Sequence, residues 1–173
     1  MSWFAQLKSY RDKIITNRVR KAFDVILATS LVLFYPPKHH SRALGIIERV
    51  LVLDPNNISC LMGRGYVLQY VDKWVEAGTL FAKVAQLIPE DLEIGLRAKE
   101  EHAWCQFHAR DIENGVAGLK NVLNILDSID DRDLDKARCL WRLGKCHWEM
   151  GGECHSLSDC GIAINIKCRQ STR

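Results

Sequence analysis

The sequence of 173 residues lacks the short motifs with which most enzymes bind phosphate or activate a nucleophile. It contains no Gly-rich phosphate loop and no G-x-S-x-G turn. No pair of carboxylates stands beside a lone nucleophile in a recognisable arrangement, and no low-complexity segment is present. We therefore expect a protein without enzymatic activity and without a cofactor.

Long apolar runs are also missing. The strongest candidate, Ala22–Tyr35, is only 14 residues long, contains Asp24 and stops at Pro36, whereas a membrane-spanning helix needs about 20 apolar residues. The segment therefore favours a buried core helix, and we expect no membrane among the partners. An adaptor anchored to a membrane through residues 3–35 remains an alternative.

A strong excess of charge of one sign is absent as well. The net charge is +3, with +6 in residues 1–42 and −3 in residues 43–173. A nucleic-acid-binding protein usually has a stronger positive charge, so we expect RNA to be contacted only indirectly. The basic N-terminus is compatible with an anionic partner.

The seven cysteines, an odd number, do not form the compact frame of a disulfide-rich domain. We expect reduced thiols in the cytoplasm, with the nucleus as the other possible compartment. Zinc sites usually have a C-x2–4-C spacing, which this chain lacks, so we expect no metal. A zinc-dependent module around Cys139–Cys160 remains an alternative, because metal-ligating residue types gather there: Cys139, Cys146, His147, Cys154, His155 and Cys160.

A calcium loop is the weaker metal hypothesis. Asp131, Asp133 and Asp135 have the alternating spacing of an EF-hand. However, Lys136 stands where that loop needs glycine, and Arg142 stands where it needs a bidentate glutamate. Helix capping explains these aspartates better.

The sequence does contain an internal repeat with a spacing of 34 residues. In each copy a small residue is followed by larger apolar residues four and seven positions later, which lie on one helix face. A proline then ends the helix. The matched pairs are Ala43 and Ala77, Ile47 and Phe81, Val50 and Val84, and Pro55 and Pro89.

This period and this order of residue types resemble a tetratricopeptide repeat (TPR), a hairpin of two antiparallel helices. Gly65 supplies the close approach on the first helix of the clearest unit, and Gly144, Ser156 and Cys160 have the matching places in a later one. The resemblance implies an all-α fold, an α-solenoid of stacked hairpins. The residues expected to pack the repeats are Ala43, Ile47, Pro55, Gly65, Ala77, Phe81, Pro89, Gly144, Ser156 and Cys160, with Ala103, Gly115, Leu119 and Val122 in a longer middle unit.

Helical periodicity predicts where the helices lie, to within about two to four residues at each end. Asp91 is expected to cap one helix, and Asp131 or Asp133 another. We expect a basic amphipathic helix at 1–21, an array of about four helix pairs at 22–168, and a tail at 169–173. The predicted helices are 4–20, 22–35, 40–53, 57–70, 73–87, 92–109, 112–126, 133–150 and 153–168.

The first helices of TPR units line the inner face of the stack, and several aromatic residues fall on that face. Aromatic residues often anchor a partner at an interface. Packing of the tryptophans against the neighbouring repeat is the alternative explanation. The Lys and Asn clamp with which co-chaperone TPR domains bind a terminal carboxylate is absent. The candidate partner-binding residues are Tyr66, Trp104, Trp141, Lys145 and Trp148.

Three strings are more specific than the repeat itself: CLMGRGYVLQ (60–69), AKEEHAWCQF (98–107) and DKARCLWRLGKCHWEMGGE (135–153). In this order they resemble the TPR scaffold subunit of the superkiller (Ski) complex, and a fragment of such a subunit is one of the forms that we expect. The resemblance implies a scaffold that holds helicase and WD40 subunits. It further implies a role in exosome-mediated 3′-to-5′ decay of cytoplasmic mRNA.

Overall fold

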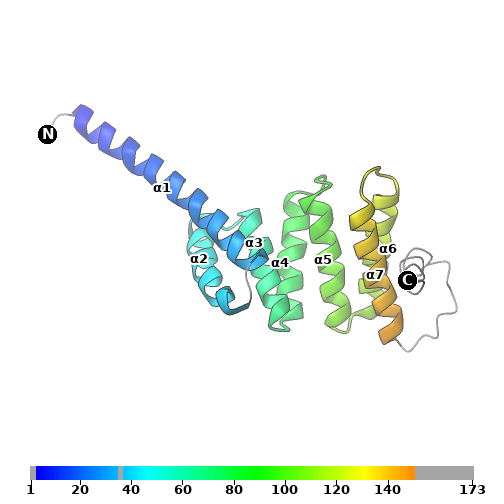
Figure 1. Cartoon of the computed structure of the whole chain (residues 1–173). Helices are drawn as coiled ribbons and strands as arrows, with labels where there is room; N and C mark the ends of the chain where they lie inside the picture. Colours follow the sequence, from blue (N-terminus) through cyan, green and yellow to red (C-terminus); the bar gives the residue numbers. More distant parts are fainter. Residues whose placement is uncertain (1–2, 35–36, 151–173) are drawn as a thin grey trace, which may run out of the picture. The chain divides into compact units, whose positions relative to one another are not determined.

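The computed structural model describes residues 3–34 and 37–150, with side chains from residue 13 onward. Within these residues every element is helical and no β-strand occurs. The expected fold class, an all-α chain of stacked TPR-like hairpins, is confirmed for the described residues. In chain order (Figure 1) the elements are α1 (Trp3–Leu33), the short 3-10 helix η1 (Pro37–His39), α2 (His40–Leu53), α3 (Ile58–Tyr70), α4 (Trp74–Leu87), α5 (Ile94–His108), α6 (Ile112–Asp127) and α7 (Asp133–Glu149).

The N-terminal region corrects one prediction. The helices expected at 4–20 and 22–35 form the single helix α1. No glycine or proline lies between Trp3 and Leu33 to interrupt the backbone hydrogen bonds, and Pro36 follows soon after the helix ends. The helix predicted at 153–168 lies outside the described residues.

The chain divides into two compact units, residues 1–73 and residues 74–173. The predicted pairing of 57–70 with 73–87 spans this boundary and stays a prediction, as does the division at 1–21, 22–168 and 169–173.

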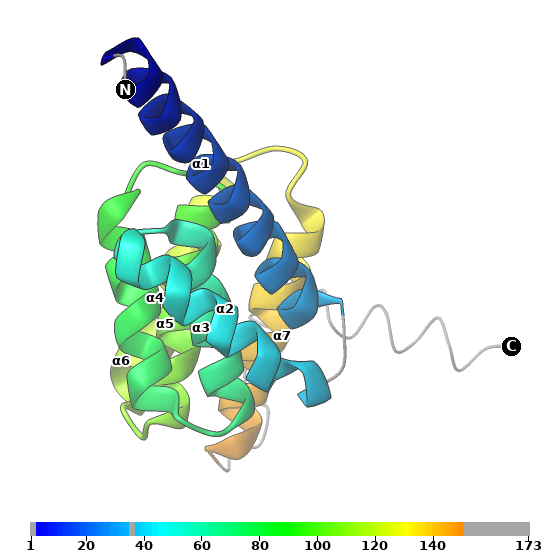
Figure 2. The same cartoon turned by 90° about the vertical axis from the view of Figure 1, so that its left-hand side faces the viewer.

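In the first unit α1 packs beside both α2 and α3 (Figure 2). The buried cluster that joins them consists of Ala28, Leu31, Ala43, Ile46, Ile47, Val50 and Cys60. An ion pair also joins α1 to the end of α2, because Lys21 Nζ lies 2.7 Å from Asp54 Oδ2. Asn57 caps α3, because its side chain accepts a hydrogen bond from the Cys60 amide at 3.1 Å.

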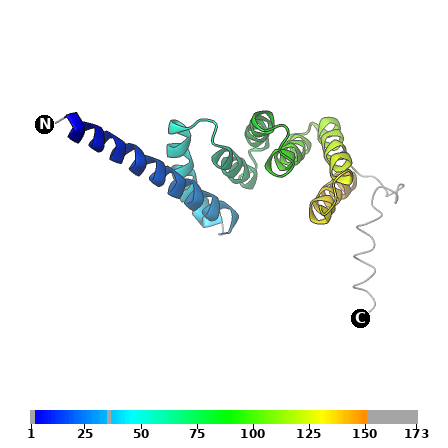
Figure 3. The same cartoon turned by 90° about the horizontal axis from the view of Figure 1, so that it is seen from above.

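In the second unit α4, α5, α6 and α7 pack in chain order (Figures 1 and 3). Helix α5 lies in the middle and also contacts α7. The buried cluster of this unit is Leu96, Ala103, Trp104, Phe107, Leu119, Val122, Leu126, Cys139, Leu143 and Cys146. Because α5 has neighbours on several sides, buried residues occur around most of its circumference.

A glycine sets the distance between α5 and α6. A Cβ atom added to Gly115 would lie 2.6 Å from the Phe107 amide nitrogen and 2.9 Å from the Ala103 carbonyl oxygen. Both are backbone atoms, which cannot move aside as a flexible side chain can. Only glycine allows these two helices to approach so closely.

Both predicted helix caps differ from the structure in position. The N-cap residue of α5 is Glu93, whose side chain makes no capping hydrogen bond, but Asp91 two residues earlier supplies these bonds in its place. The Asp91 carboxylate accepts hydrogen bonds from the amides of Glu93, Ile94 and Gly95 at the start of α5. These bonds hold the pKa of Asp91 below its usual value. The predicted cap by Asp131 or Asp133 is wrong.

At the start of α7 the N-cap residue is Arg132, and its side chain makes no capping hydrogen bond. Asp133 is instead the first residue of the helix, and Asp131 has a positive φ of 60° in the preceding turn.

Among the described residues, no helix combines the length and the apolar character that crossing a bilayer requires.

Candidate protein-interaction surface

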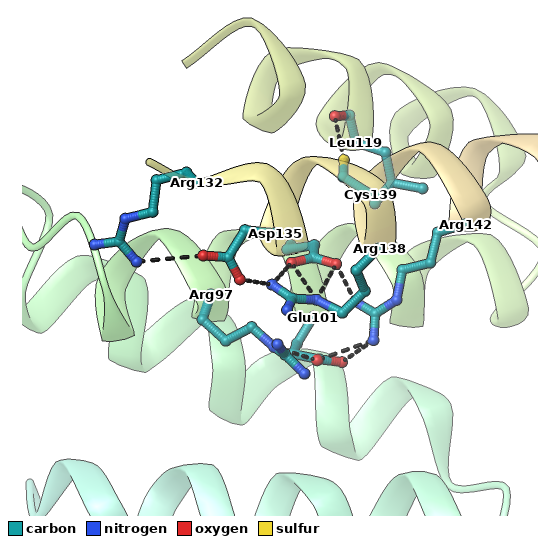
Figure 4. Close-up of polar contacts among 9 residues, drawn as sticks. Arg97, Glu101, Leu119, Arg132, Asp135, Arg138, Cys139 and Arg142 are labelled. Atoms are coloured by element: carbon teal, nitrogen blue, oxygen red, sulfur yellow. Dashed lines mark hydrogen bonds and ion pairs between the residues drawn. The ribbon is translucent and has the colours of Figure 1, made fainter. Parts of the chain in front are cut away.

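Two adjacent glutamates are buried in the middle of the second unit. Glu100 and Glu101 on α5 are 1% and 0% exposed. A buried carboxylate is costly unless it is paired and hydrogen-bonded. The partners that satisfy both come from α5 itself and from α7 (Figure 4).

Glu100 is held by two arginines of α7. Arg138 Nε and Nη2 donate to its carboxylate at distances from 2.7 to 3.1 Å, in the bidentate geometry that makes such pairs strong. Arg142 Nη1 lies 3.0 Å from Glu100 Oε1, an ion pair without an aligned hydrogen bond. Arg138 also bridges to Asp135 at 2.7 Å, and Arg132 to Asp135 at 3.2 Å.

Glu101 completes the network. Arg142 Nη2 donates to both of its oxygens at 2.9 and 3.0 Å, and Arg97 Nε donates at 2.8 Å from one turn earlier on α5. Figure 4 shows Arg142 of α7 and Arg97 of α5 converging on the Glu101 carboxylate. We call Arg97, Glu100, Glu101, Asp135, Arg138 and Arg142 the α5–α7 ion network.

An aromatic layer lies next to this network. The Arg142 guanidinium carbon is 5.3 Å from the centre of the Trp104 ring, within the range of a cation–π contact. The Trp104 and Trp141 rings are 6.2 Å apart. Lys145 Nζ lies 5.5 Å from the Trp104 ring and 5.6 Å from the Trp141 ring. The network thus fixes α7 so that Trp141 lies beside Trp104.

The predicted partner-binding residues differ in exposure. Trp104 is only 8% exposed, so most of its ring packs within the unit. Trp141 and Trp148 are 58% and 77% exposed, although large apolar side chains are usually buried. Lys145, whose side chain is 42% exposed, lies between them in sequence. We call Trp141, Lys145 and Trp148 the α7 face.

Tyr66, the fifth predicted residue, belongs to α3 in the first unit and is half-buried. The structure therefore brings Trp104, Trp141 and Lys145 together, and it places Trp148 two turns further along α7. These positions leave the role of the residues in binding a prediction.

Sequence reasoning missed the buried acidic pair. Glu100, Glu101 and Arg142 were not predicted as a cluster, because charged residues are expected at the surface. The one signal was the pair of glutamates in AKEEHAWC, two residues from Ala98 and from Ala103 in a helix that is central to its unit. The spacing of four residues between Arg138 and Arg142 places both arginines on one face of α7.

The residues expected to pack the repeats occupy varied environments. Ala43, Ile47, Ala77 and Phe81 are at most 1% exposed, and Gly65 is buried. The remaining positions are of other kinds. Gly144 is half-buried, Pro55 and Pro89 are exposed just beyond the ends of α2 and α4, and Ser156 and Cys160 lie outside the described residues.

The described cysteines are buried free thiols: Cys60, Cys105, Cys139 and Cys146. Burial raises the pKa of the Cys139 thiol to about 12, and those of Cys60 and Cys146 to about 11. Within the described residues no group of three or more His, Cys, Asp or Glu side chains could hold a metal ion. The zinc alternative also involved Cys154, His155 and Cys160, which lie outside the described residues.

Comparison with known proteins gives a consistent relationship. No family model matches the chain. Superkiller protein 3 of Saccharomyces cerevisiae is 30% identical over 129 residues, which are 74% of this chain and 9% of that protein. Superkiller protein 3 of Schizosaccharomyces pombe is 23% identical over 128 residues, again 74% of this chain and 9% of the relative. These matches confirm the resemblance drawn from the sequence: over about three quarters of its length, the chain is homologous to a short part of Superkiller protein 3.

Proposed function

We propose that this chain acts as a non-catalytic TPR scaffold within a Ski complex that assists exosome-mediated 3′-to-5′ mRNA decay in the cytoplasm. The observation that carries the proposal is the 30% identity to yeast Superkiller protein 3 over 129 residues. The chain spans 9% of the length of that relative, so it supplies one stretch of the scaffold.

The proposed partners are proteins, namely the helicase and WD40 subunits of the complex, and RNA is contacted only through them. The α7 face is the proposed contact. Trp141 and Trp148 offer large exposed aromatic surfaces. Lys145 adds a positive charge beside Trp141, with Glu149 as its ion-pair partner at 3.7 Å. Interfaces concentrate their binding energy in such aromatic anchors.

The α5–α7 ion network holds in place the helix that carries the α7 face. A docking surface works best when its side chains are held in place before the partner arrives, since less conformational entropy is then lost on binding. The bidentate contacts from Arg138 and Arg142 to Glu100 and Glu101 link α7 to the central helix. The exposed tryptophans therefore stand on a supported helix.

Affinity purification tests the proposal. The tagged full chain is expressed in cells of its source organism, and the proteins that copurify are quantified by mass spectrometry against a tag-only control. We expect a helicase and a WD40 protein, together with exosome subunits, among the enriched proteins. Recovery of none of these would refute the proposal. A second purification after nuclease treatment should retain the protein partners, because the proposed contacts do not pass through RNA.

A further inference from the structure

A groove between α1 and α2 in the first unit is not explained by the proposed scaffold contact on α7. It encloses about 520 Å³. Helix α1 supplies one wall, and the second half of α2 supplies the other. Its lining residues are Ile14, Asn17, Arg18, Arg20, Lys21, Asp24, Arg49, Val50 and Leu53.

The charge around the groove is unbalanced. Four cationic side chains line it, against the single carboxylate of Asp24. Lys21 is already neutralised by Asp54 at 2.7 Å. Arg18 and Arg20 form no ion pair with any described residue, and the Arg49 guanidinium donates only to the Gly45 carbonyl on its own helix. Three exposed arginines are therefore available to an anionic ligand.

Three apolar residues also line the groove. Val50 is buried at 2% exposure, whereas Leu53 and Ile14 are 76% and 49% exposed. Exposed apolar side chains inside a concave, basic rim suit a ligand that brings its own apolar side chain together with carboxylates. Among the lining residues there is no aromatic ring on which a nucleic-acid base could stack.

We propose that this groove binds an acidic segment of a partner protein, with an apolar side chain of that segment packed on Ile14 and Leu53 and its carboxylates paired with Arg18, Arg20 and Arg49. The charge complementarity identifies the occupant as acidic, and the exposed apolar side chains favour a peptide over a nucleic-acid backbone. The inference is independent of the α7 face, because every residue involved belongs to the first unit.

A binding assay on the full chain tests it. Fluorescence anisotropy is measured with a labelled twelve-residue peptide of repeating EEL and with a matched EES peptide that lacks the apolar side chain. We expect EEL to bind more tightly than EES. The triple variant R18Q/R20Q/R49Q should weaken EEL binding about tenfold, because three surface charge contacts are lost. Leu53→Ser should weaken the binding of EEL and leave that of EES unchanged.

Controls make the result specific to the groove. K38Q/R42Q/K120Q removes three exposed charges that do not line it, and this variant should bind EEL as the unmodified chain does. The reversed variant R18E/R20E/R49E should instead bind a peptide of repeating KKL, which also shows that the altered chain is folded.

Four outcomes would overturn the proposal. The first is equal binding of EEL and EES, and the second is an equal loss of affinity in K38Q/R42Q/K120Q. The third is failure of the reversed variant to bind KKL. The fourth is tighter binding of dodecauridylate RNA, or of phosphatidylserine vesicles, than of EEL, with loss of that binding in R18Q/R20Q/R49Q.

Discussion

The most informative residues of the second unit are charged and buried. Removing Glu100 and Glu101 from water costs several kcal/mol per ion, roughly, before any partner is counted. Their arginine partners offset this cost only through close, aligned contacts, and five of the hydrogen bonds measure 3.0 Å or less. A buried ion pair of this kind is weak evidence for stability but selects one arrangement of helices, since any other leaves a charge unpaired.

Arg142→Ala tests this network. The substitution leaves Glu101 buried without its α7 partner, and we expect the free energy of unfolding to fall by about 3–5 kcal/mol. Arg132→Ala is the matched control, because Asp135 is the ion-pair partner of Arg132 among the described residues and both are partly exposed. Its loss should lower the free energy of unfolding by about 0–1 kcal/mol. Urea unfolding followed by tryptophan fluorescence measures both. An equal fall in the free energy of unfolding in the two variants would show that the buried contacts stabilise the fold no more than the surface ion pair does.

The Cys139 thiol predicts a loss of stability at alkaline pH. Burial raises its pKa to about 12 from the ordinary value of 9.0. Above pH 9 the unfolded chain releases this proton while the folded chain retains it, so the thiol's contribution is complete below about pH 9 and is lost as pH rises toward 12. Cys60 and Cys146 act in the same direction.

Comparison with Cys139→Ala isolates this effect from other alkaline titrations. The difference in unfolding free energy between the original chain and the variant should be constant from pH 6 to 8 and should shrink between pH 9 and 11. Chemical denaturation at each pH measures it. A difference that stays constant to pH 11 would contradict the raised pKa.

At the scale of the elements, α5 differs from its neighbours because it is the central helix. Helices at the surface of a stack have one apolar stripe, whereas α5 has buried residues around most of its circumference. The close approach of α6 at Gly115 and the ion pairs to α7 fill the remaining sides. Substitutions on α5, or of residues that contact it, should therefore lower the free energy of unfolding more than equivalent substitutions on outer helices.

Gly115→Ala makes this comparison. Its methyl group would meet the backbone of α5 at 2.6 Å, so the helices must separate, and we expect a loss of about 1–3 kcal/mol in stability. Gly45→Ala on α2 is the control. No atom lies within 4 Å of its added Cβ, and the better helix propensity of alanine should raise stability by about 0.5–1 kcal/mol. Thermal and urea denaturation distinguish the opposite signs.

At the scale of the whole molecule, the chain combines two units with separate apolar clusters. Its relatives are much longer, and this chain covers 9% of each. Any contact that the described residues make with a partner uses surfaces of these two units. The α7 face and the groove between α1 and α2 are two such surfaces, each built within one unit.

If partners bind at the α7 face, substitutions there should weaken binding without lowering the free energy of unfolding much. Trp141→Ala and Trp148→Ala remove mostly exposed rings, so we expect unfolding free energies within about 1 kcal/mol of the original and a clear loss of copurifying partners. Trp104→Ala empties a largely buried site and should cost about 3–5 kcal/mol. Denaturation combined with quantitative copurification measures both effects. Unchanged partner recovery in the Trp141→Ala/Trp148→Ala double variant would remove the α7 face from the interface.

Much of the helical architecture could be predicted from local patterns. The repeat of 34 residues placed Ala43 and Ala77 on buried helix faces, and Pro55 and Pro89 just after helix ends, because helix periodicity and proline stereochemistry act over a few residues. The predicted spans of α2 to α7 agree with the observed helices to within about two residues. The break expected near residue 21 was wrong, since a change from basic to apolar composition does not by itself end a helix.

The succession of helices and their likeness to a TPR scaffold follow from the order of residue types along the chain. Which charged side chains become buried depends on how the helices pack in three dimensions. Glu100 and Arg138 are 38 residues apart in the chain, and they meet only because the intervening helix α6 returns the chain so that α7 packs beside α5. Burial and pairing of these groups depend on that three-dimensional approach, and a one-dimensional pattern of charges does not specify it.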